Sequence, residues 1–406
     1  MRLFAAFLVR CLLVLAAACA HAQNFAWDVQ GLPTGSLGRY VQVLREYGPP
    51  WSVEQAQERF VQANPPPLRD EVLSFGIGAA PVWILLPLHN EDLVSQRMRL
   101  LLGTTWMDSA DVYVVKAGKV RSHWHLGDEA PYAYGVVPGF GFEWELEVPT
   151  QRSLLLVRVQ SLDPLVLPIQ LLDAVALASQ RDIVQSGYEL LFGALFALVL
   201  YNLALFAVAR HHLHLRYALY VGTMLLLCIA YTGHGLASWW PDSPGFQRYV
   251  ILCGMVFFNA VGLSFAMHFL HLPRQRPRVT RLLRWGQWIA LGGMAGCALL
   301  DRHAWAVWWA FSVFLVSTML LFGLGVWAAW SRQPSGRLFF AAVSVSMAGA
   351  TLAWLSVTGT VGFSMASLHA MEAGFLVDAG LLAIALGQRI VAERKMAMPE
   401  QADTAM

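Results

Sequence analysis

Cysteine and charge are both scarce in this sequence. The five cysteines all lie outside residues 23–173, so a domain in that region has no disulfide and depends on an ordinary packed core. Charged residues make up only 13% of the chain, and the formal net charge is +2. Neither half is basic enough to bind nucleic acid through its phosphates. The composition therefore excludes a disulfide scaffold and a nucleic-acid-binding protein.

The motifs of the common enzyme classes are missing as well. The sequence contains no Gly-rich phosphate loop, no nucleophile elbow and no HExxH zinc motif. We therefore expect no enzymatic activity and no cofactor.

The N-terminus has the pattern of an export signal. Arg2 and Arg10 precede an apolar run, and Ala20-His21-Ala22 is the small-x-small pattern that a signal peptidase accepts. We predict a signal peptide over residues 1–22. A lipoprotein signal with Cys19 as the lipidated residue is a weaker alternative, because Ala16 stands where such signals usually have leucine.

Residues 23–173 have the short alternating runs and turn residues of an all-β sandwich. In residues 142–148, FEWELEV, the apolar side chains alternate with three glutamates, which predicts a strand with one buried face and one solvent-exposed face. One helix interrupts this pattern: Ser52 and Gln55 form a capping box, and prolines from Pro65 on bar its extension. The predicted strands are 82–88, 98–103, 111–118, 119–125, 142–148, 154–161 and 168–173.

Residues 187–395 contain seven long apolar segments, each near the ~20 residues that a helix needs to cross a bilayer. This pattern predicts a membrane protein with an all-α bundle of seven transmembrane helices. The segments are about 187–209, 217–239, 249–269, 283–300, 305–330, 338–359 and 368–390. Residues 174–186 join the sandwich to the first of them with helical spacing and no Gly or Pro. We expect a stiff linker, which can transmit motion.

Basic residues decide the orientation, because short cytoplasmic loops retain Lys and Arg. The outer loops carry only Arg248 and Arg302, whereas the inner connections are rich in arginine. We therefore expect a bacterial inner-membrane protein with a periplasmic N-terminal domain and a short cytoplasmic tail over residues 396–406. The loop after the third helix is expected to anchor anionic lipid and, secondarily, to dock a cytoplasmic partner. Its basic residues are Arg274, Arg276, Arg278, Arg281 and Arg284.

Ionisable residues within the membrane are costly and therefore informative. Glu189, His234, His369 and Glu372 all fall near the outer boundary, and we weigh a hydrogen-bonded polar cluster against separate contacts with lipid headgroups. Asp378 lies deeper and is the best candidate for a conformational switch residue.

The depths of the histidines argue against a zinc site within the membrane, because zinc ligands must converge on one point. His234 and His369 are expected near the outer surface, about 30 Å from those near the inner surface. The inner histidines are His211, His212, His214, His268 and His271. We expect no metal.

The sandwich is rich in aromatic residues, which sugar-binding surfaces use against pyranose rings. Trp124, His125, Asp128 and Tyr132 fall together in residues 123–135 and are the candidate ligand contacts. The alternative is that such rings belong to the core, as we expect for Trp83 and Trp144.

Taken together, the mature chain resembles the bacterial seven-transmembrane receptors with diverse intracellular signalling modules, including their type-2 extracellular domain. The matching stretches are SVEQAQERF, Trp83 in PVWILLPL, residues 105–115, His125 to Asp128, residues 187–202, residues 233–241, Phe269-Leu270 and residues 381–390. The resemblance implies a carbohydrate-binding-like jelly roll outside the membrane. Asp378 stands where relatives usually have glutamate. Relatives usually continue into a kinase, cyclase or phosphatase domain, whereas here eleven residues follow Lys395. We therefore expect any output to act in trans, with a truncated relative that has lost its output as the alternative.

These observations predict a sensor that binds a small ligand outside, with a saccharide as one candidate, and signals to a separate cytoplasmic kinase or diguanylate cyclase. A ligand would shift the bundle between two packings. A homodimer is left open. The alternative function is a transporter or membrane assembly factor with a periplasmic binding module. Against it, the sequence has no internal repeat, and its prolines lie in the loops rather than at the membrane midplane.

Overall fold

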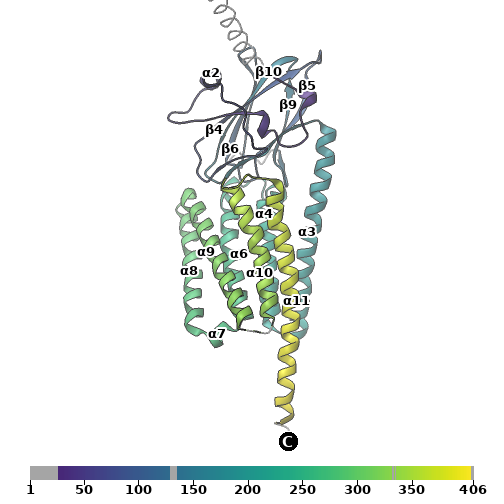
Figure 1. Ribbon diagram of the computed structural model, residues 1–406, viewed down its shortest axis with the longest axis vertical. Helices are drawn as coiled ribbons and strands as arrows, with labels where there is room; N and C mark the ends of the chain where they lie inside the picture. The colour runs from purple at the N-terminus through teal and green to yellow at the C-terminus, as the bar shows by residue number, and fades with distance from the viewer. Residues whose placement is uncertain (1–25, 129–134, 332, 334, 404–406) are drawn as a thin grey trace, which may run out of the picture.

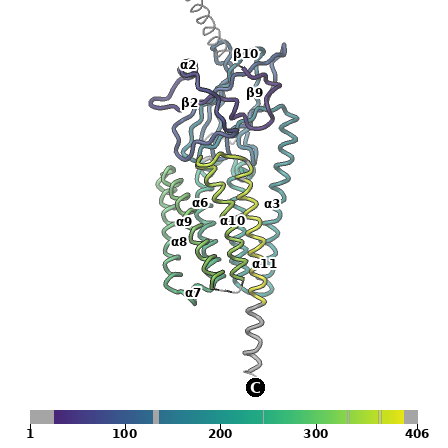
Figure 2. The backbone as a smooth tube through the Cα atoms, viewed as in Figure 1, coloured from purple at the N-terminus to yellow at the C-terminus, as the bar shows by residue number. Residues whose placement is uncertain are grey.

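The computed structural model describes residues 26–128, 135–331, 333 and 335–403. Its strands gather at one end of the molecule and its long helices at the other (Figures 1 and 2). This arrangement confirms the predicted order of a β-rich region followed by a helix bundle. The predicted signal peptide, 1–22, lies outside the described residues.

Two sheets make up most of the β-rich region. In the larger sheet the order is β1-β4-β10-β6-β7, and β2 also pairs with β4; in the smaller one the order is β12-β5-β9-β8. The strands of the larger sheet are β1 (Trp27–Asp28), β2 (Gln42–Arg45), β4 (Val82–Asn90), β6 (Ser109–Lys116), β7 (Lys119–Leu126) and β10 (Gln151–Gln160). Those of the smaller sheet are β5 (Gln96–Leu102), β8 (Val136–Val137), β9 (Gly141–Val148) and β12 (Ile169–Leu172). A separate pair joins β3 (Leu73–Gly76) to β11 (Leu165–Leu167).

The main core lies between the two sheets. Val112 and Val157 of the larger sheet pack in the same buried cluster as Leu100 and Phe142 of the smaller one. In β9 the glutamates at 145 and 147 are exposed, whereas Leu146 is buried, as the alternating sequence predicts. Burial of this alternating face therefore fixes the register of the strand.

Helix α2 (Val53–Ala63) covers the outer face of the larger sheet, where its Phe60 packs with the fully buried Trp83. Ser52 and Gln55 form the predicted capping box: Ser52 Oγ accepts from the Gln55 amide, and Gln55 Oε1 accepts from the Ser52 amide. Asn64 ends the helix in the left-handed region, just before the prolines.

All seven predicted strands are present, with boundaries shifted by a few residues. Five further strands were not predicted, β1, β2, β3, β8 and β11, and neither were the 3-10 turns at Val29–Gly31 and Gly38–Tyr40. These elements span two to four residues. Such runs are too short to display a periodic pattern.

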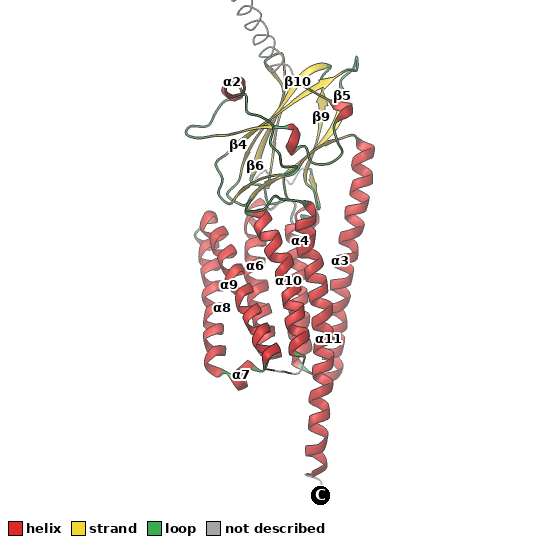
Figure 3. Cartoon of the chain, in the orientation of Figure 1, coloured by secondary structure: helices red, strands yellow, loops and turns green. Residues whose placement is uncertain are grey.

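The helical region contains seven long helices in the described part of the chain, with short ones between them (Figure 3). The long helices are α3 (Ala174–Ala209), α4 (His212–Tyr231), α6 (Pro244–Phe269), α8 (Pro277–Leu299), α9 (His303–Trp330), α10 (Gly336–Val357) and α11 (Met365–Asp403). The short ones are α5 (His234–Ser238) and α7 (Leu272–Gln275).

Six of the long helices are long and apolar enough to cross a membrane, and α8 is not among them. Arginines occupy its first turns, at 278, 281 and 284, which lowers its mean hydropathy. The helix nevertheless packs against α6 and α9. It presents Trp285, Trp288 and Ile289 on an exposed face. Its apolar exposed face is suited to contact with lipid.

The prediction of one continuous helix over residues 217–239 is wrong. Helix α4 ends at Tyr231, and α5 begins only at His234. Gly233 lies between them with a φ of 85°, and a Cβ there would come within 2.5 Å of Thr105 Cγ2. The chain therefore turns where the sandwich approaches it, and only glycine fits.

Two other helices are longer than expected. Helix α3 runs without a break through residues 174–186, the expected linker, and Asp173 caps it by accepting from the Ala176 amide. Helix α11 continues through Pro399 to Asp403, beyond the predicted end near residue 390 and into the expected tail. A proline φ is compatible with a helix, although it removes one hydrogen bond.

Candidate functional site

The sandwich is attached directly to the outer end of the bundle. Thr105 Oγ1, in the loop after β5, donates to the Tyr231 carbonyl at the end of α4 over 2.6 Å. Gln247 Nε2 of α6 donates to the Thr105 carbonyl over 3.3 Å. Ser74 of β3 donates to the Ser356 carbonyl near the end of α10. Thr105 and Ser74 of the sandwich thus form hydrogen bonds with three helix ends.

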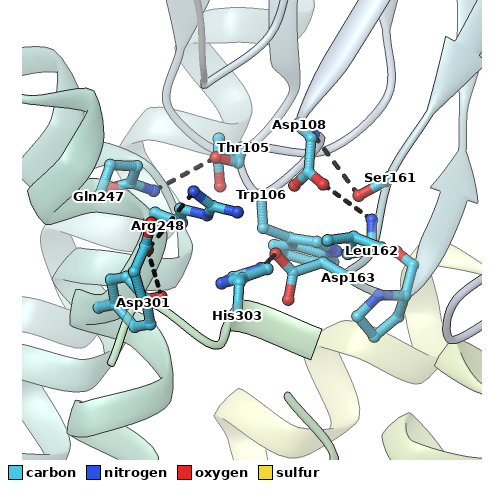
Figure 4. A network of polar contacts seen from close by, with 12 residues as sticks. Thr105, Trp106, Asp108, Ser161, Leu162, Asp163, Gln247, Arg248, Asp301 and His303 are labelled. Carbon is cyan, nitrogen blue, oxygen red and sulfur yellow. Dashed lines mark hydrogen bonds and ion pairs between the residues drawn. The ribbon is translucent and has the colours of Figure 1, made fainter. Parts of the chain in front are cut away.

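A buried pair of side chains joins the sandwich to α9 at the same junction. His303 Nε2, in the first turn of α9, lies 3.0 Å from Asp163 Oδ2 in the loop after β10 (Figure 4). Above them, Asp108 Oδ2 accepts from the Leu162 amide over 2.8 Å. All three ionisable residues are buried. Burial makes these contacts costly to break, because separated partners would be left unpaired.

Asp108, Asp163 and His303 are also the described residues whose ligand types suit a metal. Their ligand atoms lie within 4.8 Å of one another. Within this group, Asp108 accepts from the Leu162 amide, and His303 contacts Asp163.

A second polar cluster lies inside the outer half of the bundle, around Glu372 of α11. Tyr188 of α3 and Tyr231 of α4 both donate to Glu372 Oε1, over 3.0 and 2.8 Å. His369 Nδ1 lies 2.8 Å from Glu372 Oε2. The cluster ties three helices to one buried carboxylate.

The other two residues of the predicted cluster are placed differently. His234 Nδ1 lies 2.8 Å from Thr232 Oγ1, and its ring is 5.2 Å from the Tyr188 ring, so it joins the cluster only through that tyrosine. Glu189 is exposed and accepts from Gln185. It directly follows Tyr188 and so faces about 100° away around the helix.

Asp378 lies on α11 below the Glu372 cluster and is 1% exposed. Tyr220 of α4 donates to its Oδ2 over 2.7 Å. One turn earlier on α4, Tyr217 donates to the Ala379 carbonyl. Helices α4 and α11 are thus connected by phenol hydroxyls at two depths.

The four candidate ligand contacts of the sandwich are not gathered at one place. His125 lies on an exposed face, with Nδ1 3.1 Å from Asp111 Oδ1, and His123 contacts the same oxygen. Trp124 faces the opposite side and packs against Trp144, with ring centroids 6.2 Å apart. Asp128 is buried at the junction, and Tyr132 lies outside the described residues.

The larger sheet buries one further carboxylate. Glu46 accepts from Arg158 Nη2 over 2.6 Å and from Trp83 Nε1 over 2.7 Å. Burial by itself raises the pKa of Glu46, but the hydrogen bonds from Arg158, Trp83 and the Trp51 amide outweigh it. The net result is a lowered pKa, so the carboxylate stays ionised near neutral pH.

The five arginines of the predicted inner loop lie at the end of the bundle that is distant from the sandwich. Arg274 lies on α7, Arg276 caps α8, and the others follow on the first turns of α8. All five are exposed. They can therefore contact lipid headgroups or another protein.

Sequence reasoning missed the tyrosines that hold both buried carboxylates, and the Asp163–His303 pair. Tyrosines 188, 220 and 231 are ordinary residues of apolar segments, and their partners lie 141 to 184 positions away in the chain. Their hydroxyls within predicted spans were the available signal, since such a group needs a partner in the membrane.

The fold and the junction define a helix-bundle membrane protein with an outward β-rich domain. A family model described as 7TM diverse intracellular signalling matches residues 187–389, and one described as 7TMR-DISM extracellular 2 matches residues 38–173. The chain belongs to this 7TMR-DISM family, which suggests a transmembrane sensor or signalling receptor. Among curated proteins, none matches the chain.

Proposed function

We propose that this protein binds a small ligand with its sandwich and signals through its bundle to a separate cytoplasmic protein. The observation that carries this proposal is the junction, where loops of the sandwich are hydrogen-bonded to the ends of α4, α6 and α10. A change in the sandwich must alter these contacts or move the helices. The protein acts by binding, without catalysis.

The two carboxylates of α11 are the proposed switch. Glu372 joins α11 to α3 and α4, and Asp378 joins it to α4 at a greater depth. A shift of α11 exchanges these hydrogen bonds for others. A ligand favours one packing only by its difference in affinity for the two.

A saccharide is the ligand class that we propose for the exposed face of β6 and β7. His123 and His125 are about half exposed there, and both contact the carboxylate of Asp111. The ring of Tyr113 stacks on His123, with centroids 4.4 Å apart. Carboxylate and imidazole groups suit sugar hydroxyls, and aromatic rings suit the apolar faces of a pyranose.

The proposed location is the bacterial inner membrane, with the sandwich in the periplasm and the C-terminus in the cytoplasm. The exposed arginines of α7 and α8 would then face anionic lipid and a cytoplasmic kinase or diguanylate cyclase. A homodimer would present two such surfaces.

The test is crosslinking in the native membrane, followed by pull-down of the full-length protein. We expect a cytoplasmic kinase or cyclase to be recovered, and Asp378→Asn to change its yield. Asp182→Asn, at an exposed site of α3, is the matched control and should leave the yield unchanged. Recovery of transport or envelope proteins alone would favour a transporter or assembly factor instead.

A further inference from the structure

A cavity of about 130 Å³ lies between the sandwich and the outer half of the bundle. Five helices line its walls, and loops of the sandwich form its roof. The wall residues include Leu227 of α4, Leu252 of α6, Phe311 of α9, Ala353 of α10 and Phe375 of α11. Trp106, Asp163 and Pro164 contribute to the roof. The cavity is therefore built by both parts of the chain and exists only where they meet.

Its size and walls define what it can hold. A closed cavity of about 150 Å³ with aliphatic and aromatic walls takes up a molecule such as benzene, and this partly open cavity offers a similar volume. Here the walls are mostly aliphatic and aromatic side chains. The charged lining residues are Asp128 and Asp163 of the sandwich, of which Asp163 contacts His303, and Arg248 in the first turns of α6, which lies 3.7 Å from Asp301. Such a site favours an uncharged apolar molecule of about one ring.

One polar group in the wall has a specific requirement. Trp354 Nε1, on α10, is buried and has no hydrogen-bond partner among the described residues. A buried indole N–H usually finds an acceptor. Leaving such a donor unpaired is costly, so a ligand gains if it brings an acceptor that the indole can turn to meet.

We propose that this junction cavity is a binding site for a small uncharged molecule that carries one ring and a carbonyl-type acceptor. This site is separate from the exposed His123–His125 face and does not depend on the ligand proposed there. A molecule in the cavity contacts the sandwich and five helices at once. It therefore stabilises the docked arrangement of the two parts.

The test uses the full-length protein in lipid nanodiscs, with binding followed by fluorine NMR. The probes are 4′-fluoroacetophenone, which has a carbonyl, and 1-ethyl-4-fluorobenzene, which has the same fluorinated ring and two-carbon chain without an acceptor. We expect a saturable bound resonance for both, with the ketone bound about fivefold more tightly. Protein-free nanodiscs measure partitioning into lipid alone.

Three variants make the test specific. Ala353→Leu fills the cavity and should abolish the bound resonance, whereas Ala348→Leu adds the same atoms at an exposed site on α10 and should preserve it. Trp354→Phe keeps an aromatic ring but removes the donor together with part of the indole. It should therefore reduce the preference for the ketone over the hydrocarbon about fivefold. This last variant keeps the test informative if Ala353→Leu fails to fold.

The proposal is overturned if no saturable resonance exceeds that of empty nanodiscs, as expected for a cavity filled by lipid chains. A resonance that persists in Ala353→Leu overturns the location. Equal affinity of the two probes overturns the role of Trp354. Because binding is read directly, each of these results is independent of whether a cytoplasmic partner is recovered.

Discussion

The sandwich and the bundle both bury carboxylates, but the groups that compensate the buried charge differ between the two. In the sandwich, Glu46 contacts the guanidinium of Arg158 over 2.6 Å, so its charge is neutralised. In the bundle, the described partners of Glu372 are two tyrosines and a histidine, and that of Asp378 is one tyrosine. None of these supplies a permanent positive charge.

This difference separates a structural ion pair from a group that can change state. A buried ion pair resists rearrangement, because separating it leaves two uncompensated charges. Neutral donors can exchange partners at a lower cost. The contrast therefore places rigidity in the sandwich and adaptability along α11, and the following four predictions test it in order of expected effect.

The largest effect is expected for Arg158→Met, which leaves Glu46 buried without its cation. We expect a loss of about 3–5 kcal/mol in the free energy of unfolding, because removal of one partner leaves the other charge buried and uncompensated. Chemical unfolding in nanodiscs measures it. Arg97→Met is the matched control, since its pair with Glu147 is mostly exposed and should matter little. Similar losses in both variants would show that burial of the pair is irrelevant.

Lowering the pH is expected to have a smaller effect on the free energy of unfolding. The pKa of folded Glu46 lies below its ordinary value of 4.5. Its contribution to stability is therefore complete above that value and is lost as the pH falls through the lowered one. Unfolding midpoints followed from neutral pH downward should show this loss. Glu46→Gln should remove that part of the pH dependence, and an unchanged profile in this variant would contradict the assignment.

Glu372→Gln should cost less than Arg158→Met, at about 1–2 kcal/mol, because the amide keeps an acceptor for the tyrosines and no charge is left unpaired. Thermal unfolding monitored by circular dichroism would measure this loss. Gln185→Ala, which removes a donor to the exposed Glu189, serves as control. A loss as large as that of Arg158→Met would break the comparison, since Glu372 would then behave as a fixed ion pair.

The smallest effects distinguish the two carboxylates of α11. Tyr231→Phe leaves Glu372 with Tyr188 and His369, so we expect the average loss of about 0.6 kcal/mol for a hydrogen bond between membrane helices. Tyr220→Phe removes the described donor of Asp378 and should cost about twice as much. Thermal unfolding of the two variants side by side measures the difference, and the reverse order would refute the contrast.

Local features of the fold were predictable from sequence. The capping box at Ser52 depends on residues three apart, and the alternation in β9 depends on neighbours, so both are visible in a short window. The long apolar runs are likewise local. Seven strands and seven long helices were therefore found, whereas five of the six strands of two to four residues were not.

The candidate sites were less predictable, because their geometry depends on contacts between distant segments. His369 and Glu372 are three apart on one helix, and their contact was foreseeable. The approach of Tyr188 to Glu372 joins residues 184 positions apart. The turn at Gly233 was missed because its cause, the docking of Thr105, lies in the other domain.

The uninterrupted helix α3 also sets the scale on which the sandwich can act. Its 36 residues span about 54 Å at 1.5 Å per residue. If such a rod pivots at its sandwich end by about 5°, its far end sweeps about 5 Å, close to one helical pitch. A rotation of the sandwich that is too small to disturb its own core would thus move the far end of α3, at the opposite membrane surface, by about the width of a side chain.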